Sequence, residues 1–363
     1  MRIALLTIHN TNSYGAMLQA FATKLILSRF GEVTFLNYST PYVERSMHPV
    51  AFEASIPGVL RAAKNIARIG PRRRLLRRFR EFQDEHFPRT ECLRDSEALA
   101  RQEVHFDLFV AGSDQIWNPA TIRSFDMTYC LDFVKSKPKI AFASSAGSHR
   151  YSAHQEEQIR RCLSGFSALG VRENDLNCYL TKLLQRDDIR TVLDPTLLLT
   201  VKEWREALAP HSAPPTEPYL LVYALKLSRD DRHLIEKVSD RLGLPVVAID
   251  QEPVLGYRAD RHVNDAGPTE CLDIISKAAF VITDSFHGTA FSVNFGIPFM
   301  CISPRAGANR LTTLLSAVGL ENLMGCGEVD EALNTDFAHA HLQLTELREK
   351  SIDFISQSIS NVR

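Results

Sequence analysis

The chain has 363 residues, of which 45% are hydrophobic and 23% charged. These values are typical of a globular protein, and the length predicts two domains rather than one. Its 42 Lys and Arg residues balance 43 Asp and Glu residues, so no overall positive charge attracts nucleic acid. No stretch approaches the roughly 18 apolar residues of a membrane span, and the opening MRIALLTIHN is typical of a buried strand rather than a signal peptide, so we expect a cytoplasmic protein.

Short apolar runs alternate with helical patterns in the first part of the chain, which predicts a parallel sheet covered by helices. We expect an N-terminal α/β domain over residues 1–206. Its predicted elements, in chain order, are the strand Arg2–Ile8, the helix Ala16–Arg29, the strand Val33–Tyr38, the helix Arg61–Arg80, and the strands Asp107–Ala111, Lys139–Ala143 and Ala168–Val171.

The predicted helix Arg61–Arg80 contains nine basic residues and an apolar stripe of Leu75, Leu76, Phe79 and Phe82. Two interpretations stay open. The segment is either a solvated helix face or a surface that binds an anionic lipid or a pyrophosphate-linked acceptor. The second interpretation predicts peripheral contact with the inner face of a membrane.

Four prolines fall within 207–218, and this density opposes both helix and sheet, so we expect a linker there. A second α/β series follows over 219–335, and 336–363 is expected to form a C-terminal helix. The predicted elements are the strand Tyr219–Leu225, the helix Arg229–Leu242, the strand Pro245–Ile249, the helix Thr269–Lys277, the strand Ala278–Thr283, the helix Thr289–Asn294, the strand Ile297–Ile302, and the helices Leu311–Val318 and His341–Ser358.

Two Rossmann-like parallel-sheet domains joined by a linker predict a cleft between them, with ligands at the carboxyl ends of strands. The most informative strand exit is FVITDSFHGTAF, where Asp284, Ser285, His287 and Gly288 follow an apolar strand. A helix expected to start near Thr289 offers free N–H groups to an anion, and Ser285 and Thr289 offer hydroxyls. We interpret His287 as a functional rather than a structural histidine.

Two further strand exits carry polar clusters. Asn12, Tyr14 and Gly15 follow the first strand, and Ser113, Asp114 and Gln115 follow the strand that ends at Ala111, with Trp117 close behind. Amides, a hydroxyl, a carboxylate and an indole suit sugar hydroxyls. The alternatives are an ordinary turn for the first cluster and a capped turn with a buried tryptophan for the second.

Two arginines also follow predicted strands. Arg172 comes after Ala168–Val171 and has the fork geometry that binds a carboxylate or phosphate; a structural ion pair with Glu173 is the alternative. Arg310 follows the strand after the His287 helix and is expected near the same site. The seven cysteines are odd in number and show no zinc-knuckle or redox spacing, so we expect no structural disulfide. The sequence has no H-E-x-x-H and no metal-ligand cluster, so we expect no metal site, and we expect no cofactor.

Six segments together resemble the polysaccharide pyruvyl transferase family. They are NTNSYGAMLQAFA, FDLFVAGSDQIWNP, LGVREND, VLDPTLLL, YLLVYAL and VITDSFHGTAFSVNFGIPF, and they run in family order across roughly residues 1–320. One departure is Gly170, where relatives commonly have Ser before Val-Arg-Glu.

This resemblance implies a fold similar to GT-B glycosyltransferases and phosphoenolpyruvate as the donor substrate. It implies a pyruvate ketal formed on a sugar of a cell-envelope or exopolysaccharide precursor, whose acceptors are commonly built on a lipid carrier. The catalytic histidine of the family falls on His287 and a donor-holding arginine on Arg172. Two rival functions remain: a GT-B-type transferase that uses a nucleotide sugar, and a non-catalytic module that binds a glycan.

Overall fold

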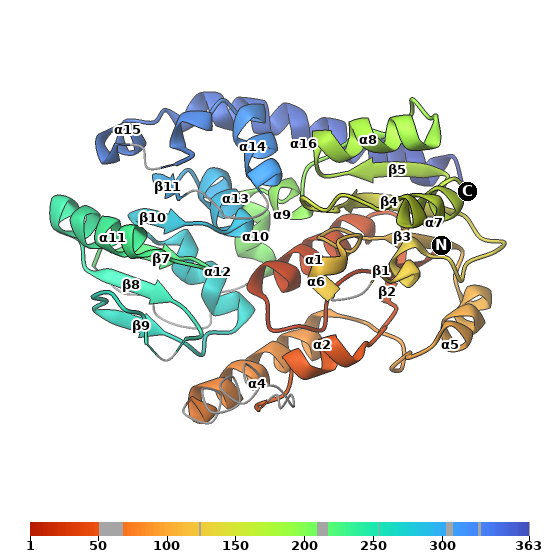
Figure 1. Ribbon diagram of the computed structural model, residues 1–363, viewed down its shortest axis with the longest axis horizontal. Coiled ribbons are helices and arrows are strands. Elements are labelled where there is room, and N and C mark those ends of the chain that lie inside the picture. The colour runs from red at the N-terminus through yellow and green to blue at the C-terminus, as the bar shows by residue number, and fades with distance from the viewer. Residues whose placement is uncertain are drawn as a thin grey trace. The chain divides into compact units, whose positions relative to one another are not determined.

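The computed structural model describes residues 1–50, 68–122, 125–208, 217–252, 254–302, 308–325 and 328–362. They form two compact units, each built on one parallel sheet (Figure 1). Unit 1 comprises Met1–Ser46, Gln83–Leu198 and Thr345–Arg363, and unit 2 comprises Met47–Phe82 and Leu199–Leu344. The chain therefore passes between the units more than once, whereas the predicted domains 1–206 and 219–335 are each continuous. Most of the predicted linker, 207–218, lies outside the described residues.

Unit 1 has a six-stranded sheet with the strand order β2-β1-β3-β4-β5-β6. The strands are β1 (Arg2–Leu6), β2 (Glu32–Phe35), β3 (Leu108–Ala111), β4 (Lys139–Ser144), β5 (Ala168–Val171) and β6 (Arg190–Thr191). Every pairing is parallel. The four residues of β3 are all fully buried, as expected for a strand covered by helices on both faces. Strand β6 was not predicted, because its two residues are exposed and give no apolar run.

The helices and helical turns of unit 1 are short except for three. They are α1 (Tyr14–Leu27), α2 (Pro41–Ser46), α5 (Ser96–Ala100), η1 (Arg101–His105), α6 (Pro119–Ile122), η2 (Met127–Cys130), α7 (Ala153–Leu163), α8 (Asn174–Leu184) and α9 (Pro195–Leu198). Helix α1 starts two residues earlier than predicted because Ser13 caps it, its Oγ accepting a hydrogen bond from the Ala16 N–H.

Unit 2 has a five-stranded sheet with the strand order β11-β10-β7-β8-β9. The strands are β7 (Leu220–Tyr223), β8 (Val246–Ile249), β9 (Arg261–Val263), β10 (Phe280–Thr283) and β11 (Phe299–Cys301), all paired in parallel. Its helices are α10 (Val201–Ala207), α11 (Arg229–Leu242), α12 (Pro268–Ser276), α13 (Phe286–Phe295), α14 (Ala308–Ala317), η3 (Glu321–Leu323) and α15 (Val329–Leu333). The edge strand β9 was missed because Arg261 is exposed and only Val263 is buried.

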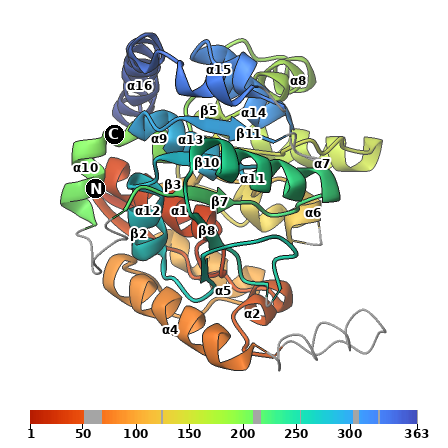
Figure 2. The same ribbon diagram turned by 90° about the vertical axis from the view of Figure 1, so that its left-hand side faces the viewer.

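Two long helices carry the chain from one unit to the other. Helix α4 (Ile69–His86) lies mostly in unit 2, and α16 (Phe337–Ser360) begins in unit 2 and ends in unit 1. Both are unbroken in Figures 1 and 2. The prediction of a C-terminal helix over 336–363 captured α16 but not its division between the units.

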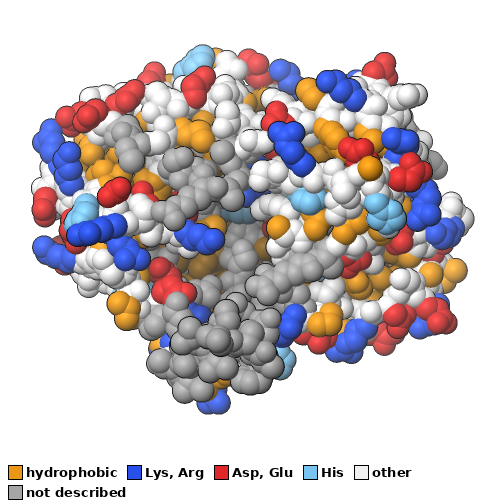
Figure 3. Space-filling model, viewed as in Figure 1, with side chains coloured by type: hydrophobic (Ala, Val, Ile, Leu, Met, Phe, Trp, Pro, Cys, Tyr) orange, Lys and Arg blue, Asp and Glu red, His pale blue; other side chains and the backbone are white. Residues whose placement is uncertain are grey.

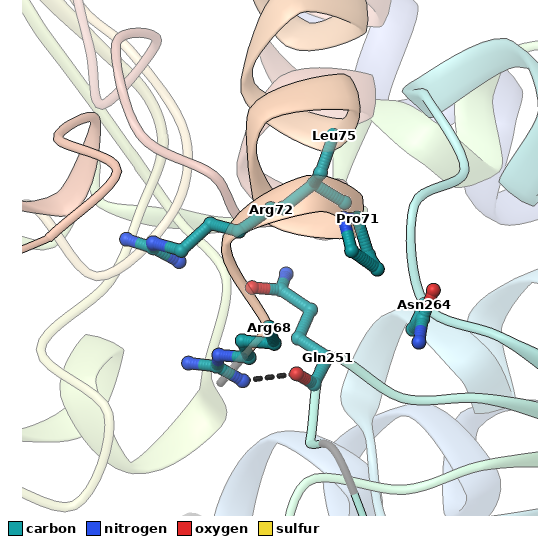
Figure 4. A pocket seen from close by; sticks show the side chains of 6 residues that line it. All are labelled: Arg68, Pro71, Arg72, Leu75, Gln251 and Asn264. Carbon is teal, nitrogen blue, oxygen red and sulfur yellow. Dashed lines mark hydrogen bonds between the residues drawn. The ribbon is translucent and has the colours of Figure 1, made fainter. Parts of the chain in front are cut away.

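Several described side chains of the basic segment bind within unit 2, and Figure 4 shows one of them, Arg68, hydrogen-bonded to the Gln251 carbonyl. Arg74 forms an ion pair with Asp265, and Arg78 pairs with both Asp265 and Glu270. Arg72 is buried and donates hydrogen bonds to the carbonyls of residues 48 and 49. Leu75, Leu76, Phe79 and Phe82 are all buried. The apolar stripe is thus interior rather than available to a membrane, and the first part of the predicted helix, 61–67, lies outside the described residues.

Acidic and basic side chains are interspersed on the face of the protein drawn in Figure 3. This distribution agrees with the nearly equal totals of 42 basic and 43 acidic residues. Six cysteines lie among the described residues and all are free thiols. Within the part of the chain that the structure describes, no helix is long and apolar enough to cross a membrane.

Candidate functional site

The strand order of unit 2 identifies one place where a ligand is expected. From β7 the chain proceeds to β8 and β9 on one side and later returns to β10 on the other side. In an open parallel sheet the crevice for a ligand lies at such a reversal, beyond the carboxyl ends of the two strands. The residues just after β7 and β10 are therefore the candidates, and the second group includes His287. We call this place the β7/β10 switch point.

Helix α13 begins at Phe286, three residues before the predicted start at Thr289. The reason is that Ser285 has extended backbone angles and its Oγ accepts a hydrogen bond from the Gly288 N–H, at 3.4 Å, which makes Ser285 the N-cap. His287 consequently lies in the first turn of the helix, where backbone N–H groups have no acceptor within the helix and the dipole favours an anion. Thr289 is fully buried and its hydroxyl contacts Cys301 Sγ.

Asp284 ties the two strand exits together. Its carboxylate accepts hydrogen bonds from the N–H groups of Leu225 and Lys226, at 2.6 and 3.0 Å. Burial raises the pKa of the Asp284 carboxyl, and these two hydrogen bonds partly offset that effect. These hydrogen bonds hold the loop after β7 beside the start of α13, and the substrate-binding role of Asp284 stays a prediction.

His287 and Arg310 both contact the ring of Phe286. The imidazole meets that ring edge-on, with centroids 5.3 Å apart and an interplanar angle of 86°. The guanidinium carbon of Arg310, on α14, lies 5.4 Å from the same ring centroid, within range of a cation–π interaction. An imidazole, a guanidinium and a helix N-terminus therefore meet around one aromatic side chain, a combination that suits a small anion.

Gly288 is enclosed by the β7/β10 switch point. A Cβ added there would overlap Thr283 Oγ1 and lie 3.0 Å from Tyr223 Cδ1. The Thr283 hydroxyl donates a hydrogen bond to the Tyr223 carbonyl, at 2.5 Å, so it cannot yield freely. The glycine lets α13 start directly against the two strands.

We predict that Gly288→Ala lowers the free energy of unfolding by about 1–3 kcal/mol, because the added methyl group has no room beside Thr283 and Tyr223. Gly70→Ala in α4 is the matched control, since its added Cβ has only Arg74 Nη1 nearby, at 3.8 Å. Thermal unfolding of both variants checks the prediction. Equal stability of the two variants would contradict it.

Unit 1 has a similar reversal between β1 and β3, because the chain moves from β1 to β2 on one side and then to β3 on the other. The clusters around Asn12 and Asp114 both follow these strands, so the sheet brings the two predicted exits side by side at the β1/β3 switch point. A hydrogen bond from Thr7 Oγ1 to the Ser113 carbonyl, at 2.8 Å, joins them directly. Tyr14 and Gly15 are buried in the first turn of α1.

Arg172 is the centre of a buried ion-pair cluster in unit 1. It contacts Asp194 through Nη1, Asp114 through Nη2 at 3.4 Å, and Glu173 through Nε at 3.8 Å. Burial alone lowers the pKa of Arg172, but the charges of the three carboxylates outweigh this effect and raise it. The structural ion pair that we kept open for Glu173 is therefore present, and it extends to two further carboxylates from other strand exits.

The remaining polar residues of the GSDQIW segment form hydrogen bonds within the loop, and their substrate-binding role stays a prediction. Ser113 is fully buried and donates a hydrogen bond to Asp194, at 3.2 Å. Gln115 Oε1 accepts a hydrogen bond from Asn118 Nδ2, at 2.6 Å. Trp117 is 3% exposed and its Nε1 donates to the Tyr129 carbonyl, so the predicted stacking surface for a sugar is instead a core residue.

Two residues of these clusters were missed by the sequence analysis. Asp194, which entered the sequence analysis only within the segment VLDPTLLL, accepts hydrogen bonds from Ser113, Arg172 and Thr196. Phe286 was regarded only as part of a motif, although its ring positions both His287 and Arg310. For Phe286 the available signal was its position just after the buried strand β10, whereas the short, exposed strand β6 before Asp194 gave no such signal.

The two parallel-sheet units define the chain as a two-domain α/β protein of the GT-B-like class. A UDP-GlcNAc 2-epimerase from Methanocaldococcus jannaschii, solved with UDP-GlcNAc and UDP, is similar over 99% of this chain and 100% of its own, with a TM-score of 0.51 and 11% identity. The Staphylococcus aureus MnaA–UDP structure is similar over 95% of this chain and 91% of its own, with a TM-score of 0.50 and 12% identity. At these identities the likeness shows the fold alone.

A family model narrows this class. The model described as polysaccharide pyruvyl transferase matches residues 14–305, which is most of the chain. The chain therefore belongs to the polysaccharide pyruvyl transferase family, which is a family of transferases. No curated protein shows significant sequence similarity to it.

Proposed function

We propose that the protein transfers pyruvate from phosphoenolpyruvate to a pair of hydroxyl groups on a sugar of a cell-envelope or exopolysaccharide precursor, and forms a ketal. The observation that carries this proposal is the grouping of His287, Arg310 and the N-terminus of α13 at the β7/β10 switch point. Phosphoenolpyruvate carries a carboxylate and a phosphate, and this grouping supplies the positive charge that both need.

The chemistry assigns one proton transfer to His287. A protonated His287 gives its proton to the methylene carbon of phosphoenolpyruvate, which leaves an oxocarbenium-like carbon at position 2. One sugar hydroxyl adds to that carbon and loses its proton. The bond between that carbon and the phosphate oxygen breaks, and the second hydroxyl then closes the ketal with loss of its own proton.

Arg310 and the α13 N-terminus are the groups that we propose for the phosphate. Charge on the departing phosphate grows during the reaction, so fixed positive groups there stabilise the transition state more than the ground state. The role of Arg172 in holding the donor, which the family resemblance implies, stays a prediction. Its guanidinium already contacts three carboxylates in unit 1.

Phosphate release from phosphoenolpyruvate across a panel of acceptor glycosides tests the proposed function. We expect release that depends on both substrates, with a product heavier by the mass of a pyruvate ketal. We also propose that no metal takes part, so the rate should persist in EDTA. Thermal stabilisation by UDP-sugars without any response to phosphoenolpyruvate would instead support a nucleotide-sugar transferase. Binding of a glycan without turnover of either donor would support a glycan-binding module.

Peripheral contact with an anionic membrane also remains a proposal, relevant to an acceptor carried on a lipid. Arg72 and Arg78 bind within unit 2, whereas Arg73 and Arg77 are exposed. We therefore expect an electrostatic contact without insertion of the helix.

We predict salt-sensitive binding to anionic vesicles that Arg73→Gln combined with Arg77→Gln weakens, because each cation near such a surface contributes about 1 kcal/mol. Co-sedimentation at low and high salt measures the effect. Phosphoenolpyruvate affinity should not change. If the wild-type protein fails to bind these vesicles at low salt, the segment is only a solvated and paired helix.

A further inference from the structure

Asp114 has a left-handed backbone conformation. Its φ is +72°, in the left-handed region that non-glycine residues seldom adopt. Its carbonyl accepts hydrogen bonds from the Ile116 and Ser145 N–H groups, at 2.8 and 3.0 Å, which hold the turn in place. Ala143, on the neighbouring strand, also has a positive φ, of +57°. Such backbone strain at a strand exit is a cost that the fold accepts in order to direct a side chain.

The three carboxylates around Arg172 are not equivalent. Asp194 is fully buried, and its two oxygens accept hydrogen bonds from Ser113, Arg172 and Thr196. Glu173 is also fully buried and accepts a hydrogen bond from Ser145. The Asp114 side chain is 13% exposed, and among the described residues its carboxylate contacts only Arg172, through Oδ1 at the long distance of 3.4 Å. Asp114 thus retains most of its capacity to accept hydrogen bonds.

A second observation at the β1/β3 switch point also indicates that a ligand there donates hydrogen bonds. The Gln19 side chain is fully buried, and its Nε2 donates to Thr7 Oγ1, at 3.2 Å, and to the carbonyls of Ile8 and Ala16. Its Oε1 is buried without a donor among the described residues, and so is Asn10 Oδ1 on the same connection. Buried acceptors without donors are costly, so hydroxyl groups or ordered water are expected here.

A ligand for this place must therefore donate hydrogen bonds. Phosphoenolpyruvate at neutral pH has oxygens that mainly accept them, and among the described residues three carboxylates surround one guanidinium here, which disfavours an anion. A sugar is neutral and donates through each hydroxyl. A carboxylate with two oxygens matches two neighbouring hydroxyls of one sugar.

We propose that Asp114 determines acceptor specificity by accepting hydrogen bonds from the hydroxyl pair of a neutral sugar at the β1/β3 switch point. This inference rests on the proposed function, because it identifies the site in unit 1 for the acceptor of that reaction. The turn and Arg172 already hold the Asp114 side chain in position, so sugar binding loses little side-chain entropy at this residue.

The test compares Asp114→Asn with the wild type. Asn adopts a left-handed backbone readily and keeps an oxygen for Arg172, but it replaces the second acceptor with a donor. We expect the acceptor KM to rise about tenfold or more, since a hydrogen bond to a charged group is lost. The KM for phosphoenolpyruvate and the thermal midpoint should stay near wild-type values. Asp126→Asn is the matched control, because both oxygens of Asp126 are already bonded, to Tyr38 and Thr128.

Acceptors that lack one hydroxyl of the pair complete the test as a double-mutant cycle. The missing hydroxyl should weaken acceptor binding strongly in the wild type and very little in Asp114→Asn. Equal losses in the two proteins, or an unchanged acceptor KM in Asp114→Asn, overturn the proposal.

Saturation-transfer NMR with methyl hexosides, without phosphoenolpyruvate, separates a failure of the proposed function from a failure of sugar binding by Asp114. If the wild type does not turn over phosphoenolpyruvate but binds a hexoside through Asp114, the proposed function and the acceptor role fail, and only sugar binding by Asp114 stands. If the wild type and Asp114→Asn bind the hexoside equally, Asp114 does not bind the sugar and the turn holds water only, which overturns the inference.

Discussion

Replacing His287 with Gln should reduce phosphoenolpyruvate-dependent transfer by about 10²–10⁴-fold, which is the usual contribution of a positioned general acid. The side chain is 8% exposed and lies in the first turn of α13, against Phe286. Gln has a similar size and can form hydrogen bonds, but it cannot deliver a proton to carbon. The loss should therefore appear in kcat more than in the KM for phosphoenolpyruvate.

The measurement is the initial rate of phosphate release at saturating acceptor, together with thermal unfolding. His287→Ala should lose activity to the same degree as His287→Gln. His262→Gln is the matched control, since His262 also belongs to unit 2 and hydrogen-bonds to the carbonyl of Asp250, the residue that follows the neighbouring strand β8. If either His287 variant keeps a rate near that of the wild type while remaining folded, His287 is not the acid.

Replacing Arg172 should destabilise the protein before it affects any substrate. Its guanidinium is 3% exposed and lies among three carboxylates from three strand exits. Arg172→Met removes the cation that contacts all three carboxylates and leaves buried negative charges together, which typically costs about 3–5 kcal/mol. Arg172→Lys should lower the free energy of unfolding by less than Arg172→Met does. It should still destabilise the protein, because one ammonium group cannot contact three carboxylates that lie in different directions around a planar guanidinium.

Thermal unfolding and the KM for phosphoenolpyruvate, measured on the same Arg172→Lys preparation, distinguish the two roles of this residue. A lower unfolding midpoint with an unchanged KM is the result expected for a structural cluster. A raised KM at unchanged stability would return Arg172 to the role of holding the donor, which the family resemblance implies. Arg186→Lys is a suitable control for stability, because Arg186 pairs with Asp188 in a more exposed part of unit 1.

Much of the fold could be predicted because its sheets are parallel. Parallel strands buried on both faces appear as short continuous apolar runs, and Leu108–Ala111 and Phe280–Thr283 are clear examples. The same pattern marks where each strand ends, so His287 and Asp114 could be identified as strand-exit residues from the sequence. Strands β6 and β9 lack that pattern because they are short and partly exposed.

The sequence by itself thus determined the α/β class, the parallel strands and the polar residues that follow them, because burial and local turn chemistry are read over a few neighbouring positions. Only the tertiary structure decided what those residues contact. Asp114, Arg172 and Asp194 are far apart along the chain yet form one cluster, because adjacent parallel strands bring their carboxyl ends to one edge. The basic helix was likewise ambiguous until Asp265 and Glu270, nearly two hundred positions away, were seen to pair with it. Charge partners at such separation leave no periodic signal, so folding alone reveals which charges are neutralised and which remain for a ligand.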